Sequence, residues 1–314
     1  MRSKWSLSKV SDFSGQDQSS SERRWSMKKD FFFVVALAAV IFSGSTEAGP
    51  PFINLEGVGG AAFNPLAYPA ITSTKDKSQD LVAKPRFGAW YVNLDSDIDW
   101  TTIGAADTFF KRLELSYGYE SVNLGSQLFA LNSNLSSLSQ NVHKNNIGAK
   151  LLLLEENSFD TSYIPAVSAG IIYKTTDFHV EKLGDPMTDK NGFDVYLVAT
   201  KMITQLPKSV LLSAGVLSSR GQVNGIIGFN DQRKETFFGN VDILPLDNLV
   251  IGFEYKQGPR FSSFKNDNYW NTHVAWLVNK NLSLIAAYAY AGDKYSTSKV
   301  GLGGGPVVSA QYEF

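Results

Sequence analysis

From residue 85 to its end, the chain is a series of short segments in which apolar and polar residues alternate. Because successive side chains of a strand point to opposite faces, each segment predicts a strand with one apolar face. Counting gives about twelve strands of about ten residues, the length that a tilted strand needs to cross the hydrocarbon layer. The segments begin near Phe87, Leu113, Ile147, Phe193, Val210, Phe237, Leu249, Thr272 and Leu282, among others.

The connections between these segments alternate in length. Long ones cover residues 123–141, 175–191, 219–234, 258–270 and 292–305, and short ones cover residues 155–162, 205–208, 245–247 and 279–281. Transmembrane barrels have short periplasmic turns and longer outer loops, whereas a soluble sandwich has no reason to alternate in this way. We therefore predict an all-β fold, a closed antiparallel up-and-down transmembrane β-barrel over residues 85–314. The short connection at residues 95–97 is an exception at the outer end.

The two faces of the predicted strands differ in character. The outward sets are large and apolar, and aromatic residues such as Trp90 and Trp100 recur near strand ends, where an interfacial girdle requires them. We interpret the inward charges as a lumen lining that selects a solute by charge and size. The alternative is that these charges pair with one another across a filled lumen. The inward charged residues are Arg86, Arg112, Glu114, Glu120, Lys150, Asp194, Glu254, Lys256 and Glu313.

Residues 306–314 form one alternating segment in which Val308, Ala310, Tyr312 and Phe314 share the apolar face. This segment resembles the closing strand of Gram-negative outer-membrane β-barrels, which ends in phenylalanine with tyrosine two residues before it. The resemblance implies that these four residues are an assembly signal read by the barrel-assembly machinery. As the last of an even set, the strand is predicted to pair with the strand from Leu282 and with the first strand, near residues 86–93.

The first 84 residues have a different texture. Residues 27–48 combine two lysines, a short apolar run and small residues before the end, which predicts a signal peptide. Residues 1–26 are predicted to be an upstream extension absent from the mature protein. Residues 49–84 are broken by glycine and proline yet are too apolar for a free tail. They are predicted to be an irregular plug in the barrel lumen, with a periplasmic segment packed below the barrel as the alternative.

Composition excludes several classes of function. The net charge of −1 over 314 residues gives no basic stripe for nucleic acid, and the lack of cysteine removes disulfides and cysteine-based metal sites. The mean hydropathy of −0.12 is compatible with a barrel, since half of each alternating strand is polar. Neither a metal site nor a cofactor is predicted, because His143, His179 and His273 lack a metal-binding spacing. A hydrolase would need a serine beside His143 or His273.

Three motifs stand out along the chain: NLEGVGGAAFNP at 54–65, RLELSYGY at 112–119 and DNLVIGFEY at 247–255. They resemble motifs of a bacterial domain-of-unknown-function family, family 3034, of outer-membrane proteins. The resemblance covers most of residues 49–314 and implies the barrel and the cell outer membrane, without an activity.

The leading functional hypothesis is a narrow or gated channel for a small polar solute. One alternative is a non-conducting barrel for surface interaction or for envelope or exopolysaccharide assembly, and a second is an outer-membrane hydrolase. The expected partners are outer-membrane lipid, the barrel-assembly machinery and the solute, with no nucleic acid.

Overall fold

The computed structural model describes residues 50–70, 81–95, 97–125, 139–182, 187–261, 265–293 and 299–314. The predicted upstream extension, the predicted signal peptide and part of the predicted plug lie outside these residues. Among the described residues, no helix is both long enough and apolar enough to span a membrane.

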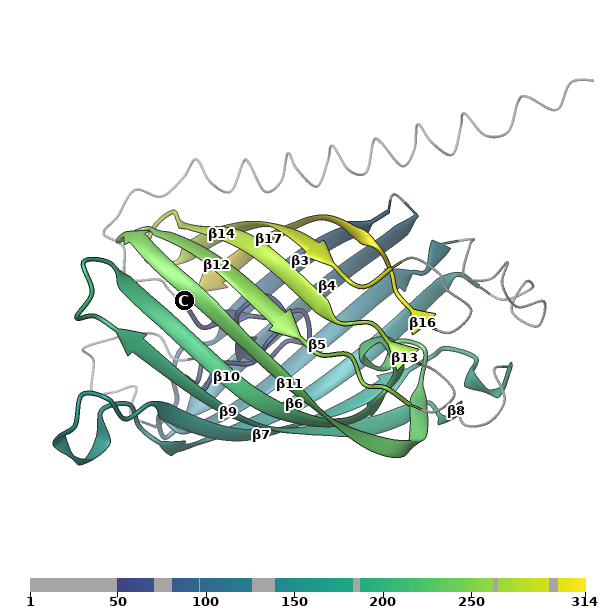
Figure 1. Cartoon of the computed structure of the whole chain (residues 1–314), viewed down its shortest axis with the longest axis horizontal. Helices are drawn as coiled ribbons and strands as arrows, with labels where there is room; N and C mark the ends of the chain where they lie inside the picture. Colours follow the sequence, from purple (N-terminus) through teal and green to yellow (C-terminus); the bar gives the residue numbers. More distant parts are fainter. Residues whose placement is uncertain are drawn as a thin grey trace, which may run out of the picture. The chain divides into compact units, whose positions relative to one another are not determined.

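Within the described residues, twelve strands form a closed antiparallel ring (Figure 1). Each strand pairs with the next along the chain, and the last strand pairs with the first, so the predicted barrel is confirmed. Closure gives the backbone of every strand two neighbours. The strands are β3 (Arg86–Leu94), β4 (Ile98–Phe109), β5 (Leu113–Asn123), β6 (Asn141–Leu154), β7 (Ala166–Thr176), β9 (Asn191–Ile203), β10 (Ser209–Gly221), β11 (Phe229–Leu246), β12 (Leu249–Lys256), β14 (Tyr269–Leu277), β15 (Leu282–Tyr290) and β17 (Gly304–Glu313).

The ring closes where the sequence predicted it would. Tyr312 of β17 is opposite Leu282 of β15 on one side. On the other side, Glu313 is opposite Arg86, the first residue of β3. The predicted pairing of the last strand is therefore confirmed.

Apart from the short β3–β4 connection at the outer end, short and long connections lie at opposite ends of the barrel, which we call the periplasmic end and the outer end. Figure 1 shows the minor strands of the long connections gathered at the outer end, on its right. They are β8 (Met187–Asp189), β13 (Lys265–Asn266) and β16 (Lys299–Val300), with the short helices η3 (Val180–Lys182) and η4 (Gln222–Gly225). The β6–β7 connection, with η2 (Ser158–Asp160), is longer than predicted, and β11 begins at Phe229, inside the predicted loop 219–234.

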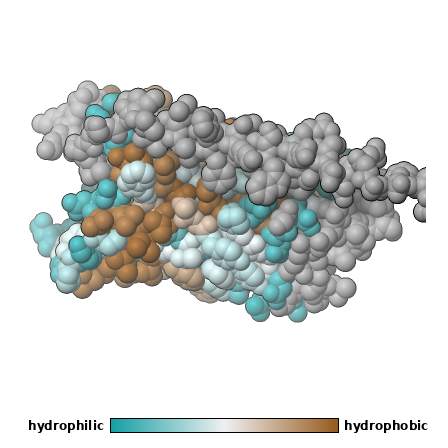
Figure 2. All heavy atoms as spheres, turned by 90° about the horizontal axis from the view of Figure 1, so that it is seen from above, coloured by the Kyte–Doolittle hydropathy of each residue, from teal (hydrophilic) through white to brown (hydrophobic). Residues whose placement is uncertain are grey.

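The outer wall of the barrel is apolar along the middle of its strands. Ile147 of β6 and Ile251 of β12 are 58% and 44% exposed, and other large apolar side chains share this outward orientation. Figure 2 shows apolar residues gathered across the visible wall, with hydrophilic residues toward its two ends. Exposed apolar surface of this extent needs a lipid environment, so the chain is a barrel of the outer membrane.

Two of the predicted girdle residues do not belong to this outer surface. Trp90 and Trp100 are buried inside the barrel at 0% and 7% exposure. The Trp90 indole Nε1 donates to the Ile53 carbonyl at 2.7 Å. The girdle interpretation is therefore wrong for both residues, because their strand positions have inward parity.

Candidate functional site

Residues 50–70, which we call the inner segment, lie inside the barrel and are buried along most of their length (Figure 1, purple). They begin with a hairpin of β1 (Phe52–Ile53) and β2 (Gly59–Gly60). The Asn54 carboxamide oxygen accepts from the backbone amides of Glu56 and Val58 and shapes the loop between them. Gly57 has φ of +85° and would clash with Tyr117 if it carried a Cβ, so only glycine permits this approach to the wall.

A wall carboxylate holds the middle of the inner segment. Glu254 of β12 accepts hydrogen bonds from three successive backbone amides, those of Ala62, Phe63 and Asn64, at 2.5, 2.9 and 3.0 Å. The Asn64 carboxamide nitrogen in turn donates to the carbonyls of Gly239 and Tyr255. The inner segment thus supplies the donors that a buried carboxylate requires.

A second clamp lies on β5 and β6. Glu114 accepts from the backbone amides of Gly59 and Ala70, each at 2.8 Å. Lys150 is 2.8 Å from the Glu114 carboxylate and donates to the carbonyls of Gly59 and Tyr68. This one ion pair therefore binds both halves of the inner segment.

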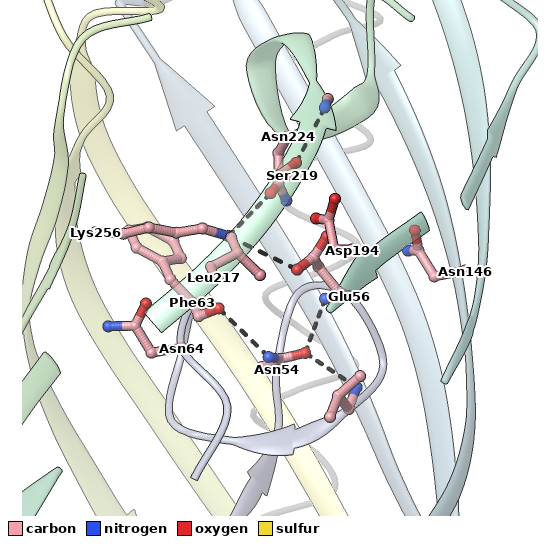
Figure 3. Close-up of polar contacts among 12 residues, drawn as sticks. Asn54, Glu56, Phe63, Asn64, Asn146, Asp194, Leu217, Ser219, Asn224 and Lys256 are labelled. Carbon is pink, nitrogen blue, oxygen red and sulfur yellow. Dashed lines mark hydrogen bonds and ion pairs between the residues drawn. The ribbon is translucent and has the colours of Figure 1, made fainter. Parts of the chain in front are cut away.

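The centre of the interior contains three lysines around Glu56 of the inner segment. Lys144 of β6, Lys174 of β7 and Lys256 of β12 form this group, which we call the lysine site. Their ammonium groups contact the Glu56 carboxylate, with distances of 3.5 Å from Lys144 and 3.7 Å from Lys256. Figure 3 shows Glu56 facing Lys256 beside the loop shaped by Asn54.

The wall provides further carboxylates for two of these lysines. Glu120 lies 2.8 Å from Lys144, and Asp194 lies 2.6 Å from Lys174. Burial opposes the ionisation of Glu56, but the three lysines outweigh it and hold the pKa of Glu56 well below the usual value of a glutamate. The charges of this cluster are therefore paired only when Glu56 is in place.

Both ends of the inner segment lie at the periplasmic end of the barrel. At its start, Arg86 donates to the Pro51 carbonyl at 2.5 Å and forms an ion pair with Glu313 at 2.6 Å. Near its end, the Tyr68 hydroxyl donates to Glu156 in the β6–β7 connection at 2.7 Å. The inner segment therefore enters and leaves through the same opening.

The outer half of the interior is filled by apolar side chains. The β10–β11 connection folds inward at residues 222–228 and buries Val223, Ile226 and Ile227. These residues belong to one cluster with Phe52 and Leu55 of the inner segment. A cavity of about 40 Å³ remains beside Leu55 and Val223.

The predicted lumen residues come together with one exception. Arg86, Glu114, Glu120, Lys150, Asp194, Glu254, Lys256 and Glu313 are all buried inside the barrel. Arg112 is wrong as a lumen residue. It lies in the turn before β5, and its side chain is 48% exposed and 2.6 Å from Glu155. Strand alternation does not extend into a turn, which is why parity failed there.

Sequence reasoning missed Lys144, Lys174 and Glu56. Lys144 lies on β6 with the same inward parity as Lys150, which was identified, so the alternation contained its signal. Lys174 lies on β7, where no inward residue was predicted. Glu56 lies in an irregular loop, and no periodicity marks it.

The histidines make contacts with acids and amides. The buried His273 ring has its Nε2 3.1 Å from Asp242 and its Nδ1 2.9 Å from the Asn271 carboxamide oxygen. The exposed His143 ring is 2.8 Å from Asp177.

The apolar face of the last strand turns outward. Tyr312 and Phe314 are 38% and 51% exposed, and their rings lie 4.9 Å apart in an edge-on arrangement. Phe314 also contacts Phe87 of the first barrel strand, with ring centres 5.6 Å apart. Val308 and Ala310 share this face and are half-buried.

A family model described as "Protein of unknown function (DUF3034)" matches residues 50–300. Among curated proteins, none matches the chain.

Several solved structures are similar over most of the chain. The KdgM porin is 14% identical with a TM-score of 0.45, over 73% of this chain and 99% of its own. Omp33 of Acinetobacter baumannii is 11% identical with a TM-score of 0.43, over 75% and 100%. The NanC porin is 8% identical with a TM-score of 0.42, over 73% and 98%. These identities and TM-scores are too low to carry an argument, and the barrel is shown by the pairing of its own strands.

Proposed function

Because this chain belongs to the DUF3034 family of proteins of unknown function, its role has to come from its own interior, and we propose a gated outer-membrane channel for small polar solutes. The inner segment is its plug, and the charged residues of the wall are its pathway. The observation that carries this proposal is the chemistry of the interface between the inner segment and the wall.

That interface combines apolar packing with buried charged groups that the wall supplies. Glu114, Lys150 and Glu254 are each 1% exposed or less and bind the inner segment through backbone amides and carbonyls. A buried ion pair costs desolvation energy that a well-packed apolar pair avoids. A barrel that is permanently filled could use apolar side chains in place of these charged ones. In a barrel that opens, water hydrates the same charged side chains once the inner segment has left. The dry, charged lining therefore favours a plug that leaves.

The route of the inner segment supports the same proposal. Because Pro51 and Tyr68 both bond to groups at the periplasmic end, the segment can withdraw in that direction without threading through the wall. Withdrawal breaks hydrogen bonds that water replaces, at a net of about 0.5–1.5 kcal/mol for a neutral bond and about 1.5–3 kcal/mol for a bond to a charged group. The apolar contacts of the inner segment add to this barrier, around Val223 in the outer half and beside Tyr196 of β9.

The test is planar-bilayer recording of the refolded mature chain and of two variants, Glu254→Gln and a deletion of residues 50–70. We expect rare openings in the parent chain, frequent openings in Glu254→Gln and steady conductance in the deletion. Heat-modifiable migration on gels checks that each variant has folded into a barrel. Folded variants without conductance would end the channel proposal.

A second candidate is a non-conducting barrel that presents its outer loops for surface interaction or helps envelope assembly. The inward connection at residues 222–228 favours it, because Val223, Ile226 and Ile227 extend into the lumen from a connection between two wall strands. The same recording separates the two functions, since this connection remains in the deletion variant.

We propose no catalytic role. His273 is turned toward Asp242 and Asn271 inside the barrel, and His143 toward Asp177, so within the described part of the chain neither ring is hydrogen-bonded to a serine hydroxyl.

We also propose that Val308, Ala310, Tyr312 and Phe314 are the signal for the barrel-assembly machinery. Their outward orientation, next to lipid and at the closing strand, supports this role.

A further inference from the structure

The Glu56 side chain occupies a site that the barrel wall builds without it. We propose that Lys144, Lys174 and Lys256 bind the carboxylate group of an anionic solute, and that Glu56 holds this position while the barrel is closed. The inference rests on the proposed channel and adds the class of solute to it. The inner segment is then both a plug and a competitor for the solute site.

The geometry is that of a carboxylate pocket. The three ammonium groups come from three different strands, β6, β7 and β12, and all contact the one Glu56 carboxylate. Lys144 and Lys174 are fully buried, and Lys256 is 7% exposed. The stems of all three lysines start from wall strands and not from the inner segment.

The charge balance indicates an anion. Once Glu56 withdraws, the three ammonium groups face two wall carboxylates, those of Glu120 and Asp194. One positive charge is left in excess on the lining of the lumen, and it attracts an anion from the water that enters. A single carboxylate restores the balance, and a cation is repelled.

The neighbouring groups keep the site open to one further carboxylate. Lys256 donates to the Asn224 carboxamide oxygen at 2.9 Å, and Lys144 donates to the Asn224 carbonyl at 2.9 Å. Both oxygens are neutral, so they orient the lysines without cancelling their charge. Asn224 belongs to η4 of the inward-folded connection, which therefore forms the outer boundary of the site.

The test is chemical rescue in the full mature chain. Glu56→Ala removes the carboxylate and leaves space for acetate. We expect a lower thermal unfolding midpoint for Glu56→Ala in sodium chloride, and a rise toward the parent value when acetate replaces chloride at constant ionic strength. Acetamide, which has the same shape without the charge, should leave the midpoint unchanged. The parent chain should respond to none of these additions.

Two variants act as controls. Glu181→Ala removes a glutamate that is half-exposed at the outer end and should show no response to acetate. In the double variant Glu56→Ala/Lys256→Met the remaining charges balance, so the acetate response should disappear. Should Glu56→Ala not refold in chloride, its refolding yield in acetate becomes the measurement. Equal effects of acetate, chloride and acetamide on either readout would overturn the site.

The two proposals fail separately. Rescue by acetate together with folded, non-conducting variants supports the site and overturns the channel. Conductance of Glu254→Gln without rescue of Glu56→Ala supports the channel and overturns the site.

Discussion

The carboxylate of Glu254 accepts hydrogen bonds from three successive backbone amides and so fixes the middle of the inner segment. Hydrogen bonds to a charged acceptor contribute about 1.5–3 kcal/mol each. Glu254→Gln keeps the shape but removes the charge and one acceptor oxygen. We expect the amides of Ala62, Phe63 and Asn64 to exchange with deuterium at least tenfold faster, as measured by mass spectrometry.

Glu235→Gln is the matched control for this prediction, because Glu235 is an exposed glutamate near the outer end of β11. It should leave the exchange of residues 62–64 unchanged. Unaltered protection in Glu254→Gln would mean that apolar packing alone holds the inner segment.

Single residues could be predicted from the sequence only where a strand fixes their orientation. Glu114 and Glu254 lie on clearly alternating strands and Lys150 on a fainter one, and parity alone placed all three inside. The prediction for Arg112 failed because this residue lies just before the start of β5, where strand alternation does not fix the direction of a side chain. Glu56 could not have been found, since its role depends on three lysines that are distant in sequence.

At the scale of elements, the strand faces should respond differently to charge. Ile147 lies at the centre of β6 and points outward, whereas Leu153, also outward, lies near the periplasmic end. An arginine facing lipid costs about 2–4 kcal/mol at the midplane and about 0–1 kcal/mol near an interface. We expect Ile147→Arg to lower the free energy of unfolding by the larger amount and Leu153→Arg by the smaller, measured by urea titration in lipid vesicles. Equal effects would mean that β6 does not cross the bilayer as described.

The connections were less predictable than the strands. Their alternation in length is typical of a barrel that crosses a membrane, and it identified the periplasmic and the outer end. The inward fold of residues 222–228 depends on tertiary packing of Val223, Ile226 and Ile227, and on the left-handed conformation of Val223 and Asn224. No local pattern distinguishes such a segment from an exposed outer loop, because the apolar partners come from the inner segment and other loops.

At the scale of the whole molecule, the sequence left two positions for the inner segment, inside the barrel or below it. Its apolar residues showed that it had to pack somewhere, and its glycines showed that it was not a regular element. The choice depends on matching between donors and acceptors, such as the amide of Gly59 and the Glu114 carboxylate. These partners are 55 residues apart, and only the closed ring brings them together.

Because the chain has no cysteine, an engineered disulfide can be used to hold the inner segment in the closed state. A Cβ built on Gly88 of β3 would lie 2.8 Å from the Cβ of Ile53 and close to the end of the flexible Gln311 side chain. A disulfide needs about 3.5–4.5 Å between these atoms, so an outward shift of about 1 Å permits the Ile53→Cys/Gly88→Cys pair to form one. We expect this pair, introduced into Glu254→Gln, to abolish conductance when oxidised and to restore it on reduction.

The control for this lock is Ile53→Cys alone in Glu254→Gln, which should conduct under both redox conditions. Conductance of the oxidised pair, with the disulfide verified by mass spectrometry, would show that solutes pass without movement of the inner segment. The wall charges would then be a structural support for the inner segment. Loss of current only on oxidation identifies withdrawal of residues 50–70 as the opening step, because the disulfide joins that segment to the first strand of the barrel and changes nothing at the outer end.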